Sequence, residues 1–230
     1  MSFYRQYGKR TIDLIAASGA VVVLSPLLLV VGAAVALKLG RPVLFRQRRT
    51  GHHRQPFNVL KFRSMLNATD EHGRALPDEE RLTAFGAWLR STSIDELPAL
   101  LNILRGEMSF IGPRPFVHIY DPLYSPAQAR RFAVRPGLTG WAQVNGRNML
   151  SWPEKFALDG WYVDQYALKM DFRILWATVE KVFGRKGIND ATGASVAAFA
   201  GETDLPPGFD PAKPISAVAT AHHAGAQEAV

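Results

Sequence analysis

The chain has 230 residues, 47% of them hydrophobic, and no cysteine, which excludes disulfides, thiolate zinc sites and thiol catalysis. Its length suits one compact domain with attachments. Its 27 Lys and Arg outnumber its 20 Asp and Glu, and the net charge of +7 favours an anionic partner: nucleic acid, an acidic membrane surface or a phosphorylated substrate.

The first element is a run of 24 uncharged residues, 14–37, "LIAASGAVVVLSPLLLVVGAAVAL". A signal peptide would have a shorter apolar region followed by a cleavage site with small residues. Here the run leads into "KLGRPVLFRQRR", so a membrane segment is favoured. As one straight helix, the run would reach about 36 Å, enough to cross a hydrocarbon core of about 30 Å.

Two observations favour a re-entrant segment instead of a spanning one. Pro26 lies near the middle and crowds the carbonyl of Val22, so the helix should kink or break there, and Ser25 could satisfy a freed carbonyl. Basic residues flank both ends of the run, although positive charge marks the cytoplasmic side. From these residues alone, both topologies stay open.

After this segment, Pro42–Gln47 and Pro56–Phe62 are predicted to be two short strands joined by the basic loop Arg48–Gln55. The polar stretch Asn67–Glu80 predicts an exposed loop. A helix is expected over Arg81–Arg90, with apolar residues on one face.

Ser125 followed by proline predicts a helix through Phe132, and Ser151 predicts one through about Ala167. Between them, Arg135–Asn148 is too rich in glycine and asparagine for a regular element. A last helix carries an apolar stripe formed by Phe172, Leu175, Trp176, Val179, Val182 and Phe183. Such a stripe favours contact with the protein core over contact with lipid. From Asn189 to Val230, few large apolar side chains remain, which predicts a mostly disordered tail.

The adjacent carboxylates of "SIDELP" have a structural and a chemical interpretation. Pro98 belongs in the first turn of a helix, which favours Asp95 as N-cap with Pro98 at the third helical position. A helix N-terminus also attracts phosphate, which would place it against Asp95 and Glu96. On this motif alone, capping is favoured.

Attack by a carboxylate on a phosphate requires a divalent metal and several cations to neutralise the charge. The chain offers six such basic side chains: Lys61, Arg63, Arg90, Arg114, Arg135 and Arg147. The last three lie in segments rich in glycine or proline, and together they suggest anion recognition by arginine.

In this order, "KFRSM", "SIDELPALLNILRGEMSFIGPRP", "RPGLTGWAQVNGRN" and "MDFRIL" resemble the bacterial sugar transferases, the monotopic phosphoglycosyl transferases. The resemblance covers residues 4–188 and is to the short form, with one membrane segment. It implies an α+β, mostly helical fold: a re-entrant helix-break-helix, then a small interfacial domain with a short β-hairpin and amphipathic helices. Residues 1–40 would be the anchor, 41–188 the catalytic domain, and 189–230 a tail without counterpart.

The resemblance also implies a two-step reaction at the cytoplasmic face of the bacterial inner membrane. An aspartate, here Asp95, would attack a UDP-sugar and release UMP, and a polyprenyl phosphate would then take the phosphosugar. Glu96 would hold Mg²⁺, and Ser25 and Pro26 would set the re-entrant break. Lys61 and Arg90 match basic motifs near the dyad, and we expect phosphate and nucleotide binding by Arg63, Arg114, Arg135 and Arg147.

Two other functions remain to be weighed. A membrane-anchored scaffold could use the same arginines to bind anionic lipid heads without catalysis. A nucleic-acid binder fits the net charge, but the apolar anchor and the lack of a recognisable motif argue against it. The sequence identifies neither the sugar nor the glycan pathway, and a homo-oligomer is compatible with it.

Overall fold

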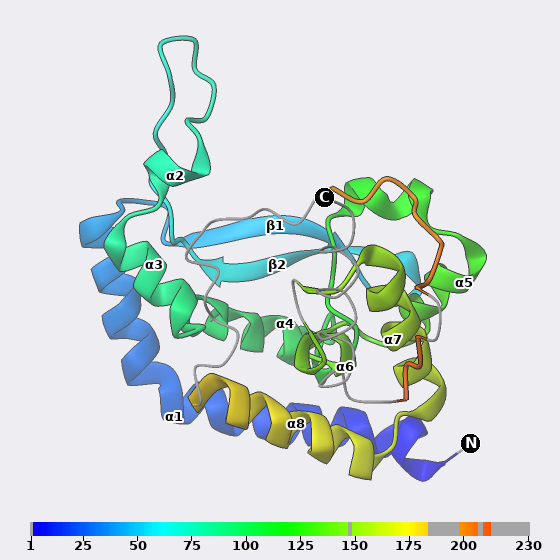
Figure 1. Cartoon of the computed structure of the whole chain (residues 1–230). Coiled ribbons are helices and arrows are strands. Elements are labelled where there is room, and N and C mark those ends of the chain that lie inside the picture. Colours follow the sequence, from blue (N-terminus) through cyan, green and yellow to red (C-terminus); the bar gives the residue numbers. More distant parts are fainter. Residues whose placement is uncertain (1, 147–148, 184–197, 207–208, 213–230) are drawn as a thin grey trace.

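The computed structural model describes residues 2–146, 149–183, 198–206 and 209–212, and has an α+β, mostly helical architecture (Figure 1). Long helices α1 (Lys9–Lys38) and α8 (Leu168–Phe183) lie along one side of the molecule, and the hairpin of β1 (Leu44–Thr50) and β2 (Pro56–Phe62) lies across from them. The remaining helices are short except α7: α2 (Asp78–Arg81), α3 (Ala84–Ser91), α4 (Leu100–Arg105), α5 (Pro126–Ala129), α6 (Trp141–Val144) and α7 (Trp152–Gln165).

Helix α1 follows a π-helical turn, Tyr4–Gly8, and continues through Pro26 without interruption. The expected break is therefore absent, and Ser25 Oγ donates to the Val22 carbonyl at 2.8 Å. Figure 1 shows a bend, in agreement with the kink that the sequence predicts as the other outcome: the first part of α1 runs beside α8, and its second part rises toward α3. A proline inside a helix removes one hydrogen bond and favours such a bend.

The two parts of α1 pack against different clusters. Ala17 is buried with Leu100 and Ile103 of α4, whereas Val35 is buried with Leu89 of α3. The outer face exposes large apolar side chains, among them Ile15, Val22, Val23, Leu29, Val30 and Leu37. Among the described residues, Tyr4–Lys38 is the one helical stretch long and apolar enough to cross a membrane. Together with its exposed apolar surface, this indicates membrane association.

The β-hairpin confirms the second predicted strand and shifts the first, which runs over Leu44–Thr50 instead of Pro42–Gln47. β1 and β2 are antiparallel, and their register runs from the pair Leu44 and Phe62 to the pair Thr50 and Pro56. Two of the basic residues assigned to the loop therefore belong to β1, because Arg48 pairs with Asn58 and Arg49 pairs with Phe57 of β2.

A second, parallel pair joins β3 (Ser109–Ile111) to β4 (Gly137–Thr139). The prediction that residues 135–148 contain no regular element is therefore wrong, since both β4 and α6 form there. The glycines serve close backbone contact: a Cβ at Gly112 would lie 2.4 Å from the Arg135 carbonyl oxygen. Only glycine permits this approach between the two strands.

Of three other predicted helices, one starts later than expected and two start where expected. The helix expected over 81–90 begins at Ala84, capped by Thr83, because Leu82 is extended. The helix from Ser125 is confirmed as α5 followed by a 3₁₀ turn, Arg130–Ala133, and α7 starts after Ser151. Each serine accepts from the backbone N–H three residues later, as their sequence predicts.

At its described positions 172, 175, 176 and 179, the apolar stripe of α8 does not face the core. Phe172 and Trp176 are 62% and 67% exposed, and Leu175 and Val179 are also exposed. Ile174 lies on the opposite side and is fully buried. The periodicity locates the stripe correctly, but the neighbouring elements cover the other face.

Part of the expected tail packs on the domain. Phe199 is only 3% exposed and lies among Tyr124, Phe132 and Phe156. The Trp141 indole N–H donates to the Pro211 carbonyl at 2.9 Å. Residues 189–197, 207–208 and 213–230, on which the rest of the disorder prediction falls, lie outside the described residues.

Candidate active site

The two carboxylates lie in a 3₁₀ helix, Ile94–Ala99, between α3 and α4. Ser93 precedes it in the left-handed conformation, with φ of 57°, and Pro98 and Ala99 are buried. Asp95 lies inside this turn instead of at its start, so the prediction that it is an N-cap is wrong. The turn leaves the Asp95 side chain free for another role.

Asp95 is buried but has no direct partner. Its side chain is 7% exposed, and no described residue forms a hydrogen bond or ion pair with its carboxylate. Burial, with a contribution from the charge of Glu96, raises its pKa, while Lys61, Arg90 and Arg114 oppose the rise. An ionised oxygen without a bound donor is suited to nucleophilic attack.

Glu96 is instead held by two cations. Lys61 Nζ lies 2.6 Å and Arg114 Nη2 lies 2.9 Å from the same Glu96 oxygen, Oε1. Burial alone would raise the pKa of Glu96, but the charges and hydrogen bonds of Arg114 and Lys61 outweigh it and hold that pKa well below its usual range. In the described part of the chain, Oε2 has no hydrogen-bond donor.

Three different elements supply the surrounding cations. Lys61 comes from β2, Arg90 from α3, and Arg114 from the turn after β3. Arg90 Nε donates to Ser64 Oγ at 2.9 Å, which fixes the guanidinium next to the dyad. The backbone contacts between Gly112 and β4 fix the path of the chain into Arg114.

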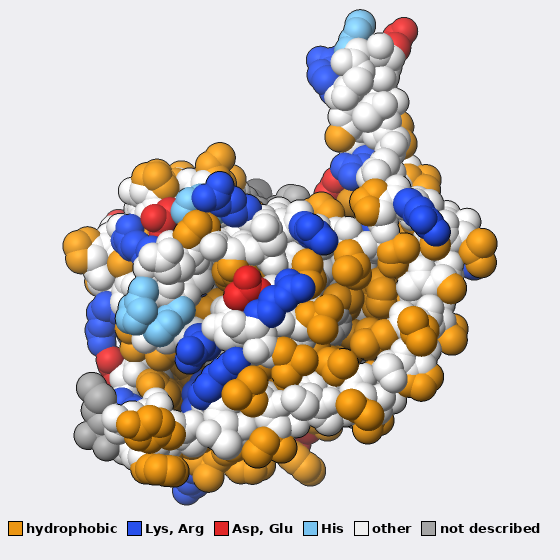
Figure 2. Space-filling model, turned by 180° about the vertical axis from the view of Figure 1, so that it is seen from behind, with side chains coloured by type: hydrophobic (Ala, Val, Ile, Leu, Met, Phe, Trp, Pro, Cys, Tyr) orange, Lys and Arg blue, Asp and Glu red, His pale blue; other side chains and the backbone are white. Residues whose placement is uncertain are grey.

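A pocket opens beside Glu96. Its apolar walls are Val59, Ala99, Met108 and Leu138, and its charged rim includes Arg49, Lys61 and Arg114. Figure 2 shows an acidic spot flanked by Lys and Arg side chains, next to a broad hydrophobic surface. A hollow lined by cations beside an apolar surface suits a substrate that carries both phosphate and lipid.

Comparison with known proteins decides the family. The model of the bacterial sugar transferases matches residues 4–185. The chain belongs to this family. It is therefore an enzyme that transfers a sugar phosphate, in agreement with the resemblance of its motifs.

Three relatives illustrate the similarity of this transferase. The uncharacterized sugar transferase EpsL of Bacillus subtilis is 48% identical over 197 residues, which cover 86% of this chain and 98% of the relative. The exopolysaccharide production protein ExoY of Rhizobium meliloti is 40% identical, over 78% of this chain and 87% of its own. A UDP-glucose:undecaprenyl-phosphate glucose-1-phosphate transferase of Caulobacter vibrioides is 40% identical, over 74% and 68% respectively.

The structure gives other partners to two of the predicted phosphate ligands in the transferase. Arg63 is 5% exposed and donates to the Gly40 carbonyl. Arg135 Nε donates at 2.8 Å to the carbonyl of Gly106, just after α4. Neither contacts the dyad, since each binds a backbone carbonyl that the sequence does not reveal. Arg147 lies outside the described residues.

Sequence reasoning did not single out Arg49. The residue was counted among the basic residues that follow the membrane run. In the structure, it belongs to β1 and lines the pocket beside Glu96. If the predicted first strand is extended to Thr50, the alternation of side chains places Arg49 on the same face of the hairpin as Lys61.

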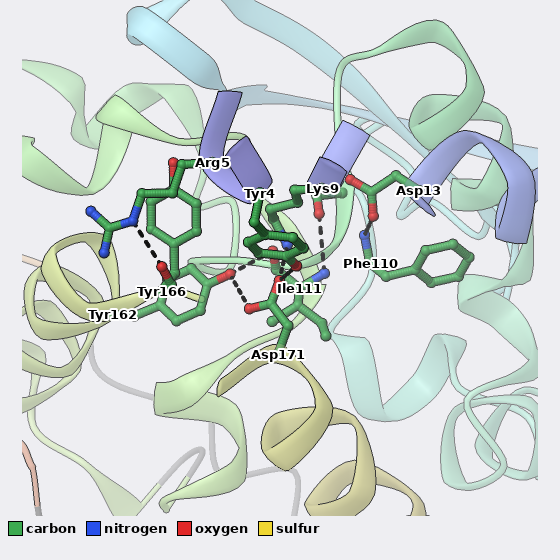
Figure 3. A network of polar contacts seen from close by, with 10 residues as sticks. Tyr4, Arg5, Lys9, Asp13, Phe110, Ile111, Tyr162, Tyr166 and Asp171 are labelled. Atoms are coloured by element: carbon green, nitrogen blue, oxygen red, sulfur yellow. Dashed lines mark hydrogen bonds and ion pairs between the residues drawn. The ribbon is translucent and has the colours of Figure 1, made fainter. Parts of the chain in front are cut away.

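A buried network ties α1 to the domain that carries the site (Figure 3). Asp171 of α8 accepts from the Tyr4 hydroxyl, from Lys9 Nζ at 2.5 Å and from the Tyr162 hydroxyl at 2.8 Å. The Tyr162 hydroxyl also lies 3.2 Å from the carbonyl oxygen of Ile111 in β3. The membrane-associated helix is thus connected to the strand that leads into Arg114.

Proposed function

We propose that this transferase moves a sugar phosphate from a UDP-sugar to a polyprenyl phosphate such as undecaprenyl phosphate, and that the Asp95 carboxylate carries the group between them. The supporting observation is the division within the dyad: Glu96 is held by Lys61 and Arg114, whereas buried Asp95 has no direct partner in the described structure. The relative from Caulobacter vibrioides is named for this reaction with UDP-glucose.

In the first step, an Asp95 oxygen forms a bond to the phosphorus that bears the sugar. The bond from that phosphorus to the bridging oxygen of the diphosphate breaks, and UMP leaves with the electron pair. Lys61, Arg90 and Arg114 reduce the repulsion between the carboxylate and the phosphate, since all three act on Asp95.

In the second step, a phosphate oxygen of the polyprenyl phosphate attacks the same phosphorus. The bond to Asp95 breaks, which restores the carboxylate and produces a polyprenyl diphosphate sugar. One nucleophile can serve both substrates in turn because the site adjoins the apolar helix α1. Covalent catalysis thereby divides the transfer into two steps at one site.

The dyad fits Mg²⁺ as a cofactor. In the described part of the chain, no three His, Asp or Glu side chains converge, and Mg²⁺ commonly uses one or two carboxylates together with substrate phosphates. Glu96 would hold the ion through Oε2, the oxygen that neither Lys61 nor Arg114 contacts. When bound, Mg²⁺ would neutralise charge on the phosphate groups.

For the membrane, we propose that α1 enters and leaves on the cytoplasmic face of the bacterial inner membrane. The bend of α1, Pro26 near its middle and the basic residues at both ends support this arrangement. The reaction would be the first membrane step of a glycan pathway, for exopolysaccharide, O-antigen, capsule or glycoprotein. ExoY of Rhizobium meliloti is named for exopolysaccharide production.

The test is a panel of UDP-sugars with the detergent-solubilised or membrane-bound protein, polyprenyl phosphate and Mg²⁺. We expect UMP release with at least one UDP-sugar, dependence on Mg²⁺, and a lipid product that contains the sugar. A protein that released no UMP from any donor, while binding anionic vesicles, would support the scaffold alternative.

A further inference from the structure

Arg49 and Lys61 lie on the same face of the β-hairpin. In the register of β1 and β2, Arg49 pairs with Phe57, and Lys61 pairs with Phe45. Side chains alternate between the two faces of a strand, so positions 45, 47 and 49 share a face with 57, 59 and 61. Arg49 therefore points to the side of the hairpin where Lys61 meets Glu96.

Unlike Lys61 and Arg114, Arg49 contacts only neutral acceptors. Its Nη1 donates to the Pro115 carbonyl at 3.2 Å, and its Nη2 donates to Gln47 Oε1. No carboxylate of the described residues forms an ion pair with it. A guanidinium has five N–H donors, so these two bonds orient the group while leaving donors for a ligand.

The charges around the pocket favour an additional anion. The two carboxylates of the dyad lie near four cationic side chains: Arg49, Lys61, Arg90 and Arg114. Of the three cations that line the pocket, Lys61 and Arg114 form ion pairs with Glu96, and Arg49 does not. Burial, together with the nearby charge of Arg114, lowers the pKa of Arg49 to about 10, so it remains cationic at neutral pH. A diphosphate would supply the missing negative charge.

Arg49 lies in the part of the site next to Glu96. Arg49 lines the pocket together with Lys61, Glu96 and Arg114, whereas Asp95 and Arg90 are not among the residues that line it. A donor whose sugar-bearing phosphate faces Asp95 would extend its second phosphate away from that carboxylate. The pocket next to Glu96 has Arg49 on its rim to receive that second phosphate.

We propose that Arg49 binds the nucleoside-bearing phosphate of the donor, the phosphate that departs in UMP. This inference rests on the proposed function, because it assigns one phosphate of the same substrate. A guanidinium suits that phosphate because its planar fork can donate two parallel hydrogen bonds.

The test compares Arg49→Ala and Arg49→Lys with a matched control, Arg48→Ala. Arg48 is the exposed neighbour of Arg49 on the opposite face of β1. We expect Arg49→Ala to raise the KM for the UDP-sugar and to weaken product inhibition by UMP about tenfold or more. Arg49→Lys, which keeps the charge but not the fork, should lie between Arg49→Ala and wild type. Arg48→Ala should match wild type.

The second half-reaction distinguishes binding of the nucleotide phosphate from binding of the polyprenyl phosphate. Protein loaded with phosphosugar at high donor concentration and freed of UMP is mixed with polyprenyl phosphate. Arg49→Ala should then react within about twofold of wild type, because the nucleoside phosphate is absent from this step. Equal UMP inhibition in Arg49→Lys, Arg49→Ala and Arg48→Ala would overturn the inference, as would slowing confined to the acceptor step. A wild type that releases no UMP would overturn the proposed function as well.

Discussion

Lys61 Nζ lies 2.6 Å from Glu96 Oε1, so the lysine is paired with the second carboxylate of the dyad and not with the first. Glu96 remains ionised because Lys61 and Arg114 bind it, while Asp95 feels these cations only at longer range. The two adjacent acids therefore have different electrostatic environments, which separates an anchored carboxylate from a reactive one.

The first prediction concerns the acid limb of the reaction. Burial raises the pKa of Asp95, and only its ionised form can attack. As the pH is lowered, kcat/KM for UMP release should therefore begin to fall at a higher pH than it would for an aspartate with an ordinary pKa. Lys61 opposes this rise, so Lys61→Met should move the acid limb upward. The measurement is the pH profile of UMP release in both proteins.

The control for this profile is Lys169→Met, which removes an exposed lysine of α8. It should leave the acid limb where wild type has it. An acid limb that stays in place or moves downward in Lys61→Met would contradict the assignment of the titrating group to Asp95.

The second prediction concerns the buried pair of Lys9 and Asp171, whose side chains are 13% and 6% exposed. Asp171→Asn removes the charge that balances Lys9 and should lower the free energy of unfolding by roughly 3 kcal/mol. The double variant with Lys9→Met should lose less than the sum of the two single changes. Thermal unfolding in one detergent measures all four proteins.

The comparison pair is Arg74 and Asp70 in the loop between β2 and α2, where the arginine side chain is 74% exposed. Asp70→Asn should leave the stability close to that of the parent protein, since exposed ion pairs contribute little. Additive effects of Lys9→Met and Asp171→Asn would show that the two side chains do not depend on each other.

Local sequence patterns predicted the parts of the fold that local interactions determine. Strand β2 has its expected limits, and Ser125 and Ser151 cap helices because each has its partner three residues later. The grouping of Lys61, Arg90 and Arg114 around the dyad also agrees with the family resemblance. These features depend on short spacings or on motifs that are read directly from the chain.

Sequence patterns did not reveal the features that distant residues decide. Asp95 is predicted to cap a helix, but the 3₁₀ helix already begins at Ile94, after Ser93 in the left-handed conformation, so Asp95 lies inside it. Arg63 and Arg135 bind backbone carbonyls at positions 40 and 106, which no sequence pattern relates to them. For α8, periodicity defined a face but not which neighbour would cover it.

The third prediction concerns the topology of α1. Cysteine placed at Ser2 and at Asn67 should be labelled from the same side of sealed vesicles, because both ends of the apolar run carry basic residues. The chain has no native cysteine, so the labels are unambiguous. Pro26→Leu should straighten the helix and shift part of the population to opposite-sided labelling.

Labelling of the two positions from opposite sides in the parent protein would show a spanning helix. If Pro26→Leu leaves the labelling unchanged, Pro26 does not set the topology. Leu29→Ala, a change of an exposed residue in the same helix, serves as the control and should keep both labels on one side.

The fourth prediction concerns α8, whose exposed apolar residues lie beside the basic residues Lys169 and Arg173. Such a helix suits the surface of a membrane. Lipids brominated in their acyl chains should quench Trp176, which is 67% exposed. Trp176→Phe should therefore remove part of the total quenching, whereas Trp152→Phe should not, because Trp152 packs in an aromatic cluster. Equal quenching in Trp176→Phe and wild type would place α8 away from lipid.

The last prediction tests the nucleophile. Because Asp95 caps no helix and burial disfavours its charge, Asp95→Asn should preserve or slightly raise the melting temperature. The amide cannot readily form an acyl phosphate, so the same variant should lose turnover. With a labelled UDP-sugar and Mg²⁺ but no acceptor, wild type should release about one equivalent of UMP and retain the sugar label, as covalent catalysis requires.

Glu96→Gln is the matched variant for Asp95→Asn. It should stay folded, with a lower melting temperature because Lys61 and Arg114 lose their anion, and its activity should respond poorly to Mg²⁺. Turnover or retained label in folded Asp95→Asn would exclude a covalent intermediate on this residue.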